Sequence, residues 1–402
     1  MPSPASRLRV VVGGYLGLLP AGGVAWDYAQ YPLGFAAIGH DVWYVEDTRL
    51  WPVYQDVCRD GAAGRGPACA PNVRHLAAVM DAFGLGGRWA YRDEATGAWF
   101  GRDARAVDAF CRSADVFVNV SCATAMAERY MQIPARLLVD TDPMFTQIQV
   151  ARGEGFTAGA RGLADAVAAH THHFTFGERV GATECRVPTG GVRWRATRQP
   201  VCLDRWPATP LPNDSHAAYT TVMNWAAGRA LEWGGEVWGQ KDVEFRRVLD
   251  LPGRVPDAPL ALAVSQTTGA PFPRADAERA GWRVLDPATV AGDWRQYHAF
   301  INASRGECSV AKETYVKART GWFSCRSACY LAAGRPVVAQ DTGWSRVLPA
   351  GCGLLAFDDA EGAADALCRI EREPARHARA ARRIAEEHFD ARAVLARMLA
   401  DV

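Results

Sequence analysis

The sequence has no excess of one charge and no long apolar run. Its 402 residues include 45 basic and 44 acidic side chains, which leaves a formal net charge of +1. Such a chain has no general attraction for nucleic acid or for an anionic membrane. No apolar stretch reaches the roughly 20 residues that a membrane-spanning helix needs. We therefore expect neither a nucleic-acid partner nor membrane insertion.

The cysteines and histidines also lack the patterns of a disulfide framework or a zinc site. The eleven cysteines are an odd number, and no two of them have C-x-x-C spacing. No cysteine or carboxylate complements His170, His172 and His173, so we expect packed or solvated histidines and no metal. Reduced thiols, and an apolar run at 8–12 that is too short for a signal peptide, predict a cytoplasmic protein.

The first half of the chain has the alternation of an α/β fold. Strand-like segments at 8–12 and 41–46 flank a glycine-rich turn and a helix near 25–38, and further strands are expected at 115–120 and 136–140. Strands that alternate with helices in this way form a parallel sheet. Polar residues that follow such strands lie where open α/β sheets bind ligands.

The alternation restarts after a proline-rich segment at 203–216, which breaks both helix and central strand. Strands are predicted at 219–224, 260–265, 282–285, 299–302, 336–340 and 354–357, and the tail from 359 to 400 is expected to be helical. The length favours two domains. We predict an N-terminal domain at 1–205, completed by a helix at about 385–402, and a C-terminal domain at 206–384.

The segment 304–355 contains a candidate phosphate site. Thr320 or Ser324 can cap a helix at 328–333, whose N-terminal amides would then face an anion such as a diphosphate. Arg326 would add a forked contact, and Lys312 or Lys317 a point charge. A second glycine-containing turn, Asp341-Thr342-Gly343, could hold the other phosphate.

Several blocks of this sequence resemble bacterial GT-B glycosyltransferases of the family 1 and 4 type. The blocks are Trp26–Tyr31, Gly39–Val42, Asp140–Pro143, Phe174–Glu178, Gly239–Asp242, Glu307–Lys312, Thr320–Arg326, Tyr330–Val338 and Gln340–Gly343. The resemblance implies two facing Rossmann-like domains with parallel sheets, an acceptor site on the first, a donor site on the second, and a final helix that crosses back. It implies a nucleotide-diphosphate sugar as co-substrate, most often a UDP or dTDP sugar, with no further cofactor and no metal.

The resemblance and the residue chemistry together assign candidate roles. Asp27, at the start of the first helix, is the candidate general base. Its ordinary pKa of about 3.9 would have to be raised by desolvation or by a neighbour such as His40. The donor set is Lys241, Glu307, Lys312, Ser324, Arg326, Asp341, Thr342 and Gly343, and the acceptor set is Gly14, Trp26, Asp140 and Asp142.

Three points remain open from the sequence. Glu307 and Glu313 are six residues apart, whereas retaining GT-B enzymes often carry two glutamates eight apart, so no stereochemical outcome is assigned. Trp225 could stack on a nucleobase or pack in the core. The fourteen tryptophans favour a small aromatic or amphipathic acceptor, and tailoring of a natural product in a GC-rich bacterium is one hypothesis.

Rival functions are a sugar transferase that acts on modified DNA bases, a non-catalytic binding protein and an NAD-dependent oxidoreductase. The last would need G-x-G-x-x-G at the first turn with an acid near residue 45. Glu46 meets the second condition, but Gly13-Gly14-x-x-Gly17 breaks the glycine spacing.

Overall fold

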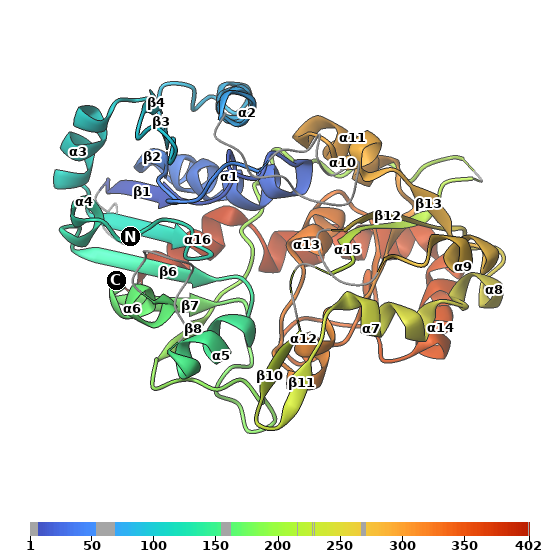
Figure 1. The fold of residues 1–402 in the computed structure, drawn as a ribbon. Helices are drawn as coiled ribbons and strands as arrows, with labels where there is room; N and C mark the ends of the chain where they lie inside the picture. The colour runs from blue at the N-terminus through green and yellow to red at the C-terminus, as the bar shows by residue number, and fades with distance from the viewer. Residues whose placement is uncertain are drawn as a thin grey trace, which may run out of the picture.

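The computed structural model describes residues 7–53, 69–153, 162–214, 216–226, 228, 230–266, 271–400 and 402. Within these ranges the chain forms two large sheets side by side, each with helices packed against it (Figure 1). The sheets have eight strands, in the order β4-β3-β2-β1-β5-β6-β7-β8, and six strands, in the order β13-β12-β9-β14-β15-β16.

The strands of the first sheet are parallel except for the antiparallel pair β3 and β4. They are β1 (Arg9–Gly13), β2 (Asp41–Glu46), β3 (Trp89–Arg92), β4 (Trp99–Gly101), β5 (Val116–Val120), β6 (Ala135–Asp140), β7 (His172–Thr175) and β8 (Trp194–Ala196).

Helices cover both faces of the first sheet, which explains why its central strands are mostly apolar. Successive residues of β1 face opposite sides: Val10 and Val12 pack with α1 and α2, and Val11 packs with α3. The helices of this half are α1 (Gly22–Ala37), α2 (Ala70–Ala82), α3 (Ala104–Arg112), α4 (Glu128–Met131), α5 (Phe145–Arg152) and α6 (Leu163–Ala168).

All neighbouring strands of the second sheet are parallel. They are β9 (Tyr219–Asn224), β12 (Leu260–Ser265), β13 (Arg283–Leu285), β14 (Gly306–Ser309), β15 (Val337–Gln340) and β16 (Leu354–Phe357). A separate hairpin pairs β10 (Leu231–Trp233) with β11 (Glu236–Trp238). The helices are α7 (Lys241–Phe245), α8 (Leu251–Arg254), α9 (Arg274–Arg279), α10 (Pro287–Ala291), α11 (Trp294–Ala303), α12 (Glu313–Ala318) and α13 (Cys325–Ala332), with 3-10 turns η2 (Arg246–Val248) and η3 (Trp344–Arg346).

One predicted strand is wrong. Residues 299–302 belong to α11, and the strand of this region is β14. The side chain of Asp293 caps α11 by accepting from the amides of Arg295 and Gln296, each at 2.8 Å. Trp294, Tyr297 and Ile301 are buried at helical spacing. The apolar run that looked like a strand is therefore one face of a well-capped helix.

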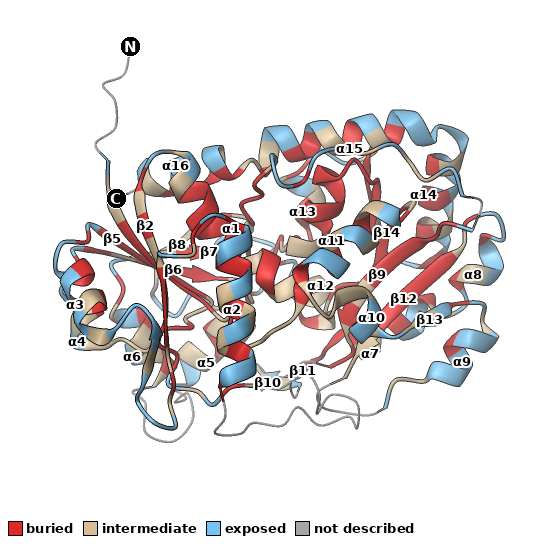
Figure 2. Cartoon of the chain, turned by 90° about the horizontal axis from the view of Figure 1, so that it is seen from above, coloured by how far each residue is buried: buried red, intermediate tan, exposed pale blue. Residues whose placement is uncertain are grey.

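The C-terminal tail is helical, as predicted, and joins the two halves. It forms α14 (Ala360–Arg372), α15 (Pro374–His388) and α16 (Ala391–Ala400). In Figure 2, α14 and α15 lie over the second half and α16 lies beside the first. A Cβ atom on Gly34 of α1 would stand 2.5 Å from Leu395 Cδ1, so α16 packs directly on α1. The backbone of Val201 exchanges hydrogen bonds with Phe389 and Ala391 at the crossover.

The proline-rich segment between the halves is anchored by a buried arginine. Arg335 is 1% exposed and donates to the carbonyl oxygens of Thr209, Pro210 and Asn302. Burial lowers the pKa of Arg335 to about 10. In the described part of the chain, no helix has the length and apolar character that crossing a bilayer requires.

Candidate functional site

The carboxyl-terminal edges of the two sheets face each other and make direct contact. In both strand orders the topology reverses beside the first strand, between β1 and β5 and between β9 and β14, where open α/β sheets bind ligands. Asp142 follows β6 and accepts a 2.5 Å bond from Lys312 Nζ and another bond from the hydroxyl of Tyr315. The indole of Trp322 donates to the carbonyl oxygen of Thr141 at 3.1 Å. The candidate site is the space at these edges.

The start of α13 opens into a small pocket on the side of the second sheet. Its walls come from the loop after β14, the first turn of α13 and the end of β15: Ser309, Val310, Ala311, Trp322, Phe323, Ser324, Arg326, Ser327, Ala339, Gln340, Thr342 and Trp344. Ser324 is the N-cap residue, but its side chain makes no capping bond. Thr320 does not cap the helix either, because its hydroxyl accepts from the amide of Trp322. The predicted cap is therefore absent, and the first amides of α13 stay available to an anion.

Arg326 is held in place at the floor of this region. Its Nε atom donates to Glu307 Oε1 at 2.5 Å, and Nη1 donates to the carbonyl oxygen of Val222 at 2.7 Å. Burial alone would lower the pKa of Arg326, but the charge and hydrogen bond of Glu307, together with the nearby tyrosines Tyr297 and Tyr330, raise it overall. Glu307 is fully buried, and its Oε2 atom has no partner among the described residues. An unpaired buried carboxylate oxygen requires an explanation, and a ligand hydroxyl would provide one.

Two lysines add positive charge beside Arg326. Lys241 is the first residue of α7 and is 9% exposed. Its pKa lies well below the ordinary lysine value, first because of burial and then because of the charges of Arg326 and Lys312. Three basic side chains thus gather in a poorly solvated region, where Glu307 pairs with Arg326 and Asp142 pairs with Lys312. The arrangement favours a polyanion as ligand.

The second predicted phosphate turn uses its donors internally. The amide of Gly343 donates to Asp341 Oδ1 at 2.9 Å, and the hydroxyl of Thr342 donates to the carbonyl oxygen of Trp322 at 2.6 Å. Asp341 also accepts from the hydroxyl of Ser345. Gly343 has φ +92°, which favours glycine. These contacts make the turn a support for the donor pocket, and they occupy the amide of Gly343 and the hydroxyl of Thr342.

Asp27 lies on α1 and faces the cations from the first half of the chain. Its side chain is half-buried, and its pKa is raised to about 7. Burial is the main cause; Arg326 lowers the pKa, Asp142 raises it, and a hydrogen bond with Cys325 lowers it. From the sequence, either desolvation or His40 was expected to raise the pKa of Asp27. Desolvation does so, and His40 does not contribute, because it lies at the amino end of the strands and accepts from the amide of Leu8.

The two aspartates after β6 have different surroundings. Asp140 is 2% exposed and accepts from the side chains of Thr146, Gln147 and Thr175 at 2.6, 2.8 and 2.7 Å. Burial raises the pKa of Asp140. Burial also opposes ionisation of Asp142, but Lys312 and Tyr315 hold its pKa below the ordinary value. Asp142 therefore faces the cleft as an anion, and Asp140 shapes the loop that carries it.

Gly14 and Trp26 occupy packing positions, which differs from the acceptor contacts predicted for them. A Cβ atom on Gly14 would lie 2.4 Å from Tyr28 Cδ1, so the ring of Tyr28 requires glycine there. Trp26 is 3% exposed, and its indole donates to the carbonyl oxygen of Trp294 at 2.9 Å. Its ring packs against Trp206 and two other rings, those of Phe83 and His298.

Sequence reasoning missed a polar group on the acceptor side. Ser121 and Cys122, directly after β5, have φ angles of +58° and +52°, which non-glycine residues rarely adopt. The strain directs the Ser121 hydroxyl to the hydroxyls of Tyr28 and Thr141, at 3.0 and 2.7 Å. The sequence did contain one indication of this group, which is a serine directly after a buried strand of a parallel sheet.

The first glycine-rich turn is occupied by the chain's own groups. The amides of Gly17 and Leu18 donate to the carboxylate of Glu46, and the amide of Leu16 donates to the hydroxyl of Tyr44. A dinucleotide pyrophosphate would need such amides. The acid that resembled a ribose-binding residue therefore caps the turn, which argues against an NAD site.

The remaining candidates are packed. Trp225 is fully buried against Phe245 and Phe272, so it packs in the core and does not reach a nucleobase. His170 is 5% exposed and hydrogen-bonded to Ala166 O, and His173 to Val167 O. Across the described ranges, no three His, Cys, Asp or Glu side chains gather in a way that could hold a metal ion.

No family model and no curated protein matches this sequence. Solved structures do match. An alpha-glucosyltransferase solved with UDP and a 13-mer DNA containing an A:G mismatch has a TM-score of 0.58 at 11% identity, over 98% of each chain. HepE from Anabaena, solved with UDP, has a TM-score of 0.54 at 11% identity, over 98% of this chain and 100% of its own.

A third similar structure is AviGT4, a glycosyltransferase involved in avilamycin A biosynthesis, with a TM-score of 0.51 at 12% identity, over 98% of this chain and 96% of the other. Similarity at this level of identity concerns the fold. The chain has the GT-B fold, and the predicted α/β architecture of two Rossmann-like halves with parallel sheets is confirmed.

Proposed function

We propose that this protein is a glycosyltransferase that moves a sugar from a nucleotide-diphosphate sugar to a small-molecule acceptor. The observation that carries the proposal is the convergence of Lys241, Lys312 and Arg326 opposite Asp27, whose pKa is raised to about 7. A polyanion site that faces a carboxylate titrating near neutrality has the parts that a sugar transfer from a diphosphate needs. The GT-B fold of the chain supports this reading.

The donor diphosphate is assigned to the three cations and to the free amides at the start of α13. Arg326 is oriented by Glu307, and its Nη2 atom has no bond to a described residue, which leaves it for the ligand. The unpaired Oε2 of Glu307 is assigned to a hydroxyl of the donor. Two similar structures were solved with UDP, so UDP sugars are the first donors to test and dTDP sugars the second.

Asp27 is assigned as the general base. It takes the proton of the acceptor hydroxyl while the acceptor oxygen forms a bond to the anomeric carbon of the sugar. The bond from that carbon to the phosphate oxygen breaks, and its electron pair leaves with the nucleoside diphosphate. The three cations stabilise the negative charge that grows on the leaving group. No step of this assignment uses a metal.

The acceptor is assigned to the first half of the chain. The rings of Tyr15 and Tyr28 pack edge to face at 5.8 Å, and Tyr28 lies close enough to Asp27 and Asp142 for their charges to affect its pKa. Aromatic walls suit a flat or amphipathic acceptor. AviGT4, a glycosyltransferase involved in avilamycin A biosynthesis, supports a natural-product acceptor.

Domain limits and location form part of the proposal. Residues 1–205, with the helix at about 385–402, would form the acceptor domain and residues 206–384 the donor domain, which agrees with the packing of α16 on α1. All ten cysteines in the described residues are free, which supports a cytoplasmic location.

Nucleotide titrations test the donor site. Calorimetry would measure the Kd of UDP, dTDP and NAD for the wild type, for Lys312→Gln and for Lys317→Gln as the control. Lys317 lies on α12, the helix that Lys312 directly precedes, but it pairs with Glu236 on the hairpin. We expect UDP or dTDP to bind about tenfold more weakly to Lys312→Gln and unchanged to the control, since one charge-assisted contact is lost. Binding of NAD alone, or an unaffected Lys312→Gln variant, would refute the assignment.

Turnover tests the acceptor class. The release of UDP from UDP-glucose would be measured with a panel of aromatic alcohols and, separately, with a DNA duplex that carries hydroxymethylated bases. The DNA arm is included because the similar alpha-glucosyltransferase was solved with DNA. Transfer to the small molecules alone supports the proposal. Transfer to DNA alone would replace the acceptor, and donor binding with neither transfer would make the protein a binding protein.

A further inference from the structure

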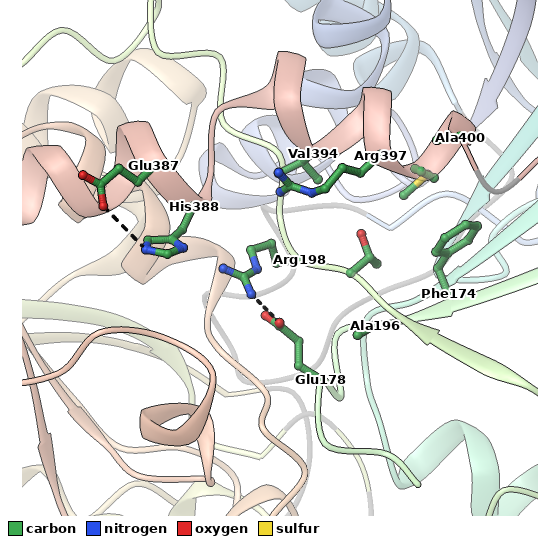
Figure 3. A pocket seen from close by; sticks show the side chains of 11 residues that line it. Phe174, Glu178, Ala196, Arg198, Glu387, His388, Val394, Arg397 and Ala400 are labelled. Carbon is green, nitrogen blue, oxygen red and sulfur yellow. Dashed lines mark hydrogen bonds and ion pairs between the residues drawn. The ribbon is translucent and has the colours of Figure 1, made fainter. Parts of the chain in front are cut away.

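A second cavity lies outside the cleft, between the last strands of the first sheet and the C-terminal helices (Figure 3). Its volume is about 540 Å³, which is in the usual range for a small-molecule pocket. Phe174, Val394 and Met398 supply apolar surface. The described residues that line it are Phe174, Glu178, Ala196, Thr197, Arg198, Glu387, His388, Val394, Arg397, Met398 and Ala400, and none of them belongs to the candidate site described above.

Two arginines reach this cavity from facing elements, Arg198 from the segment after β8 and Arg397 from α16 (Figure 3). Arg198 Nη2 donates to Glu178 Oε2, so this buried pair is close to neutral. Arg397 makes no hydrogen bond and no ion pair with any residue in the described ranges, although its charge affects the pKa of both Glu178 and His388. The cavity therefore holds one uncompensated guanidinium beside a neutral pair.

The neighbouring histidine adds no second positive charge to the cavity. Burial lowers the pKa of His388, and the charges of Arg198 and Arg397 lower it further, against the charge of Glu387. Glu387 is 67% exposed and stands 3.8 Å from His388 Nε2, on the solvent side. A guanidinium above an apolar floor matches a ligand with an anionic group and an apolar body.

We propose that this cavity is an effector site that binds a small molecule with one carboxylate or phosphate group on an apolar or aromatic body, and that its occupation changes the affinity of the donor pocket. The binding part is independent of the proposed function. The coupling part rests on it.

Two short contact routes connect the cavity with the loop before α13. The guanidinium of Arg198 lies 5.7 Å from the ring centre of Phe389, whose ring packs at 5.4 Å on Phe323 of the donor pocket. The amide of Arg179, the neighbour of Glu178, donates to the carbonyl oxygen of Thr320 at 3.0 Å.

The second route also touches the turns at Gly321 and Gly343. A Cβ atom on Gly321 would lie 2.7 Å from Arg179 Cγ, and one on Gly343 would lie 3.1 Å from Arg179 Cδ. A change at Glu178 or Arg198 would therefore act on residues that are in contact with the donor loop. Coupling between the two sites requires such a shared element, and thermodynamic linkage makes it reciprocal.

Calorimetric titration in the presence of saturating UDP tests binding, because UDP occupies the donor pocket. The probes are phenyl phosphate and benzoate, with benzyl alcohol as the neutral analogue and inorganic phosphate as the analogue without an apolar body. The variants are Arg397→Gln, which removes the unpaired charge, and Ala196→Trp, which fills the cavity from its exposed edge. Arg392→Gln is the control, since Arg392 lies on the same helix and does not line the cavity.

We expect at least one of the two anionic aromatic probes to bind the wild type and Arg392→Gln equally, and at least tenfold more weakly to Arg397→Gln and Ala196→Trp. Both analogues should bind the wild type at least tenfold more weakly than that probe. Equal affinity for Arg397→Gln, or no binding of either anionic probe with or without UDP, would overturn the site. Inorganic phosphate that binds as tightly as phenyl phosphate would overturn the apolar part of the ligand assignment.

The Kd of UDP, measured with and without the bound probe, tests the coupling. It should change at least threefold in the wild type and not at all in Ala196→Trp. An unchanged Kd in the wild type would refute coupling. Absence of UDP binding would overturn the proposed function and the coupling with it. Binding of the probe in the cavity would still be tested by the same titration without UDP.

Discussion

Replacement of Asp27 by asparagine separates the catalytic role of this residue from its effect on stability. Asparagine keeps the size and polarity of the side chain and removes its charge. The carboxylate has an ordinary pKa of 3.8 and a pKa of about 7 in the folded protein, mainly because of burial. If Asp27 is the general base, Asp27→Asn should lower kcat by about a hundredfold to ten-thousandfold and leave the Kd of UDP within about threefold of wild type.

The same pKa predicts the pH dependence of the wild type. A base has to be ionised, and at pKa 7 about 90% of Asp27 is ionised at pH 8 and about 10% at pH 6. The value of kcat/KM should therefore fall about tenfold per pH unit below pH 7 and level off above it. Initial rates of UDP release from pH 5 to pH 9, with a control for enzyme stability at each pH, would measure this limb.

Stability should change in the opposite direction to activity. Because the pKa is higher in the folded state, the proton on Asp27 favours folding below pH 3.8, and this contribution is lost as the pH rises through about 7. The shift of about 3 pKa units corresponds to at most about 4 kcal/mol, and partial exposure reduces it to about 1–3 kcal/mol. At pH 8, Asp27→Asn should therefore be more stable to urea than the wild type. A variant with near wild-type kcat, or a wild-type profile that is flat between pH 5 and 8, would refute the assignment of Asp27 as base.

Two further predictions concern the packing of the site. Arg326→Met should lower the free energy of unfolding by about 3–5 kcal/mol, because it leaves the buried Glu307 without its partner. In urea denaturation, the double variant Arg326→Met with Glu307→Gln should recover most of this loss. Failure to recover would contradict the pairing. Gly14→Ala should cost about 1–3 kcal/mol because its Cβ would meet Tyr28 at 2.4 Å, whereas Gly23→Ala, with its nearest contact at 3.4 Å, should be neutral or mildly stabilising in thermal denaturation.

Some predictions from the sequence depended on local patterns alone, and these correspond closely to the structure. The segment predicted at 8–12 corresponds to β1 at Arg9–Gly13, and the one at 260–265 to β12, because strands covered on both faces are mostly apolar. The strand predicted at 299–302 was wrong, because four residues cannot distinguish a strand from one face of a helix. The helix cap at Asp293 lies outside those four residues. The sequence showed the glycine-rich segments, but it did not show which of their backbone amides already donate to side chains of the same chain.

The roles proposed for single residues depended on information that the sequence does not contain. Trp26 and Asp27 are adjacent on α1, yet the helix directs Trp26 into the core and Asp27 toward Arg326. Lys312 and Asp142 are 170 residues apart, and their pairing required both sheets to be in place. The strain at Ser121 is likewise a property of the backbone around it.

The sequence by itself determined the alternation of strands and helices, the two halves and the chemistry of the residues at the strand ends, because these depend on hydrophobic period, turn residues and side-chain type. Only the tertiary structure decided which charges meet and which amides remain free. Burial raises the pKa of Asp27 to about 7, and the packing of the two halves brings Lys241, Lys312 and Arg326 together. Both effects come from segments that are far apart in the chain, so they exist only after the chain has folded.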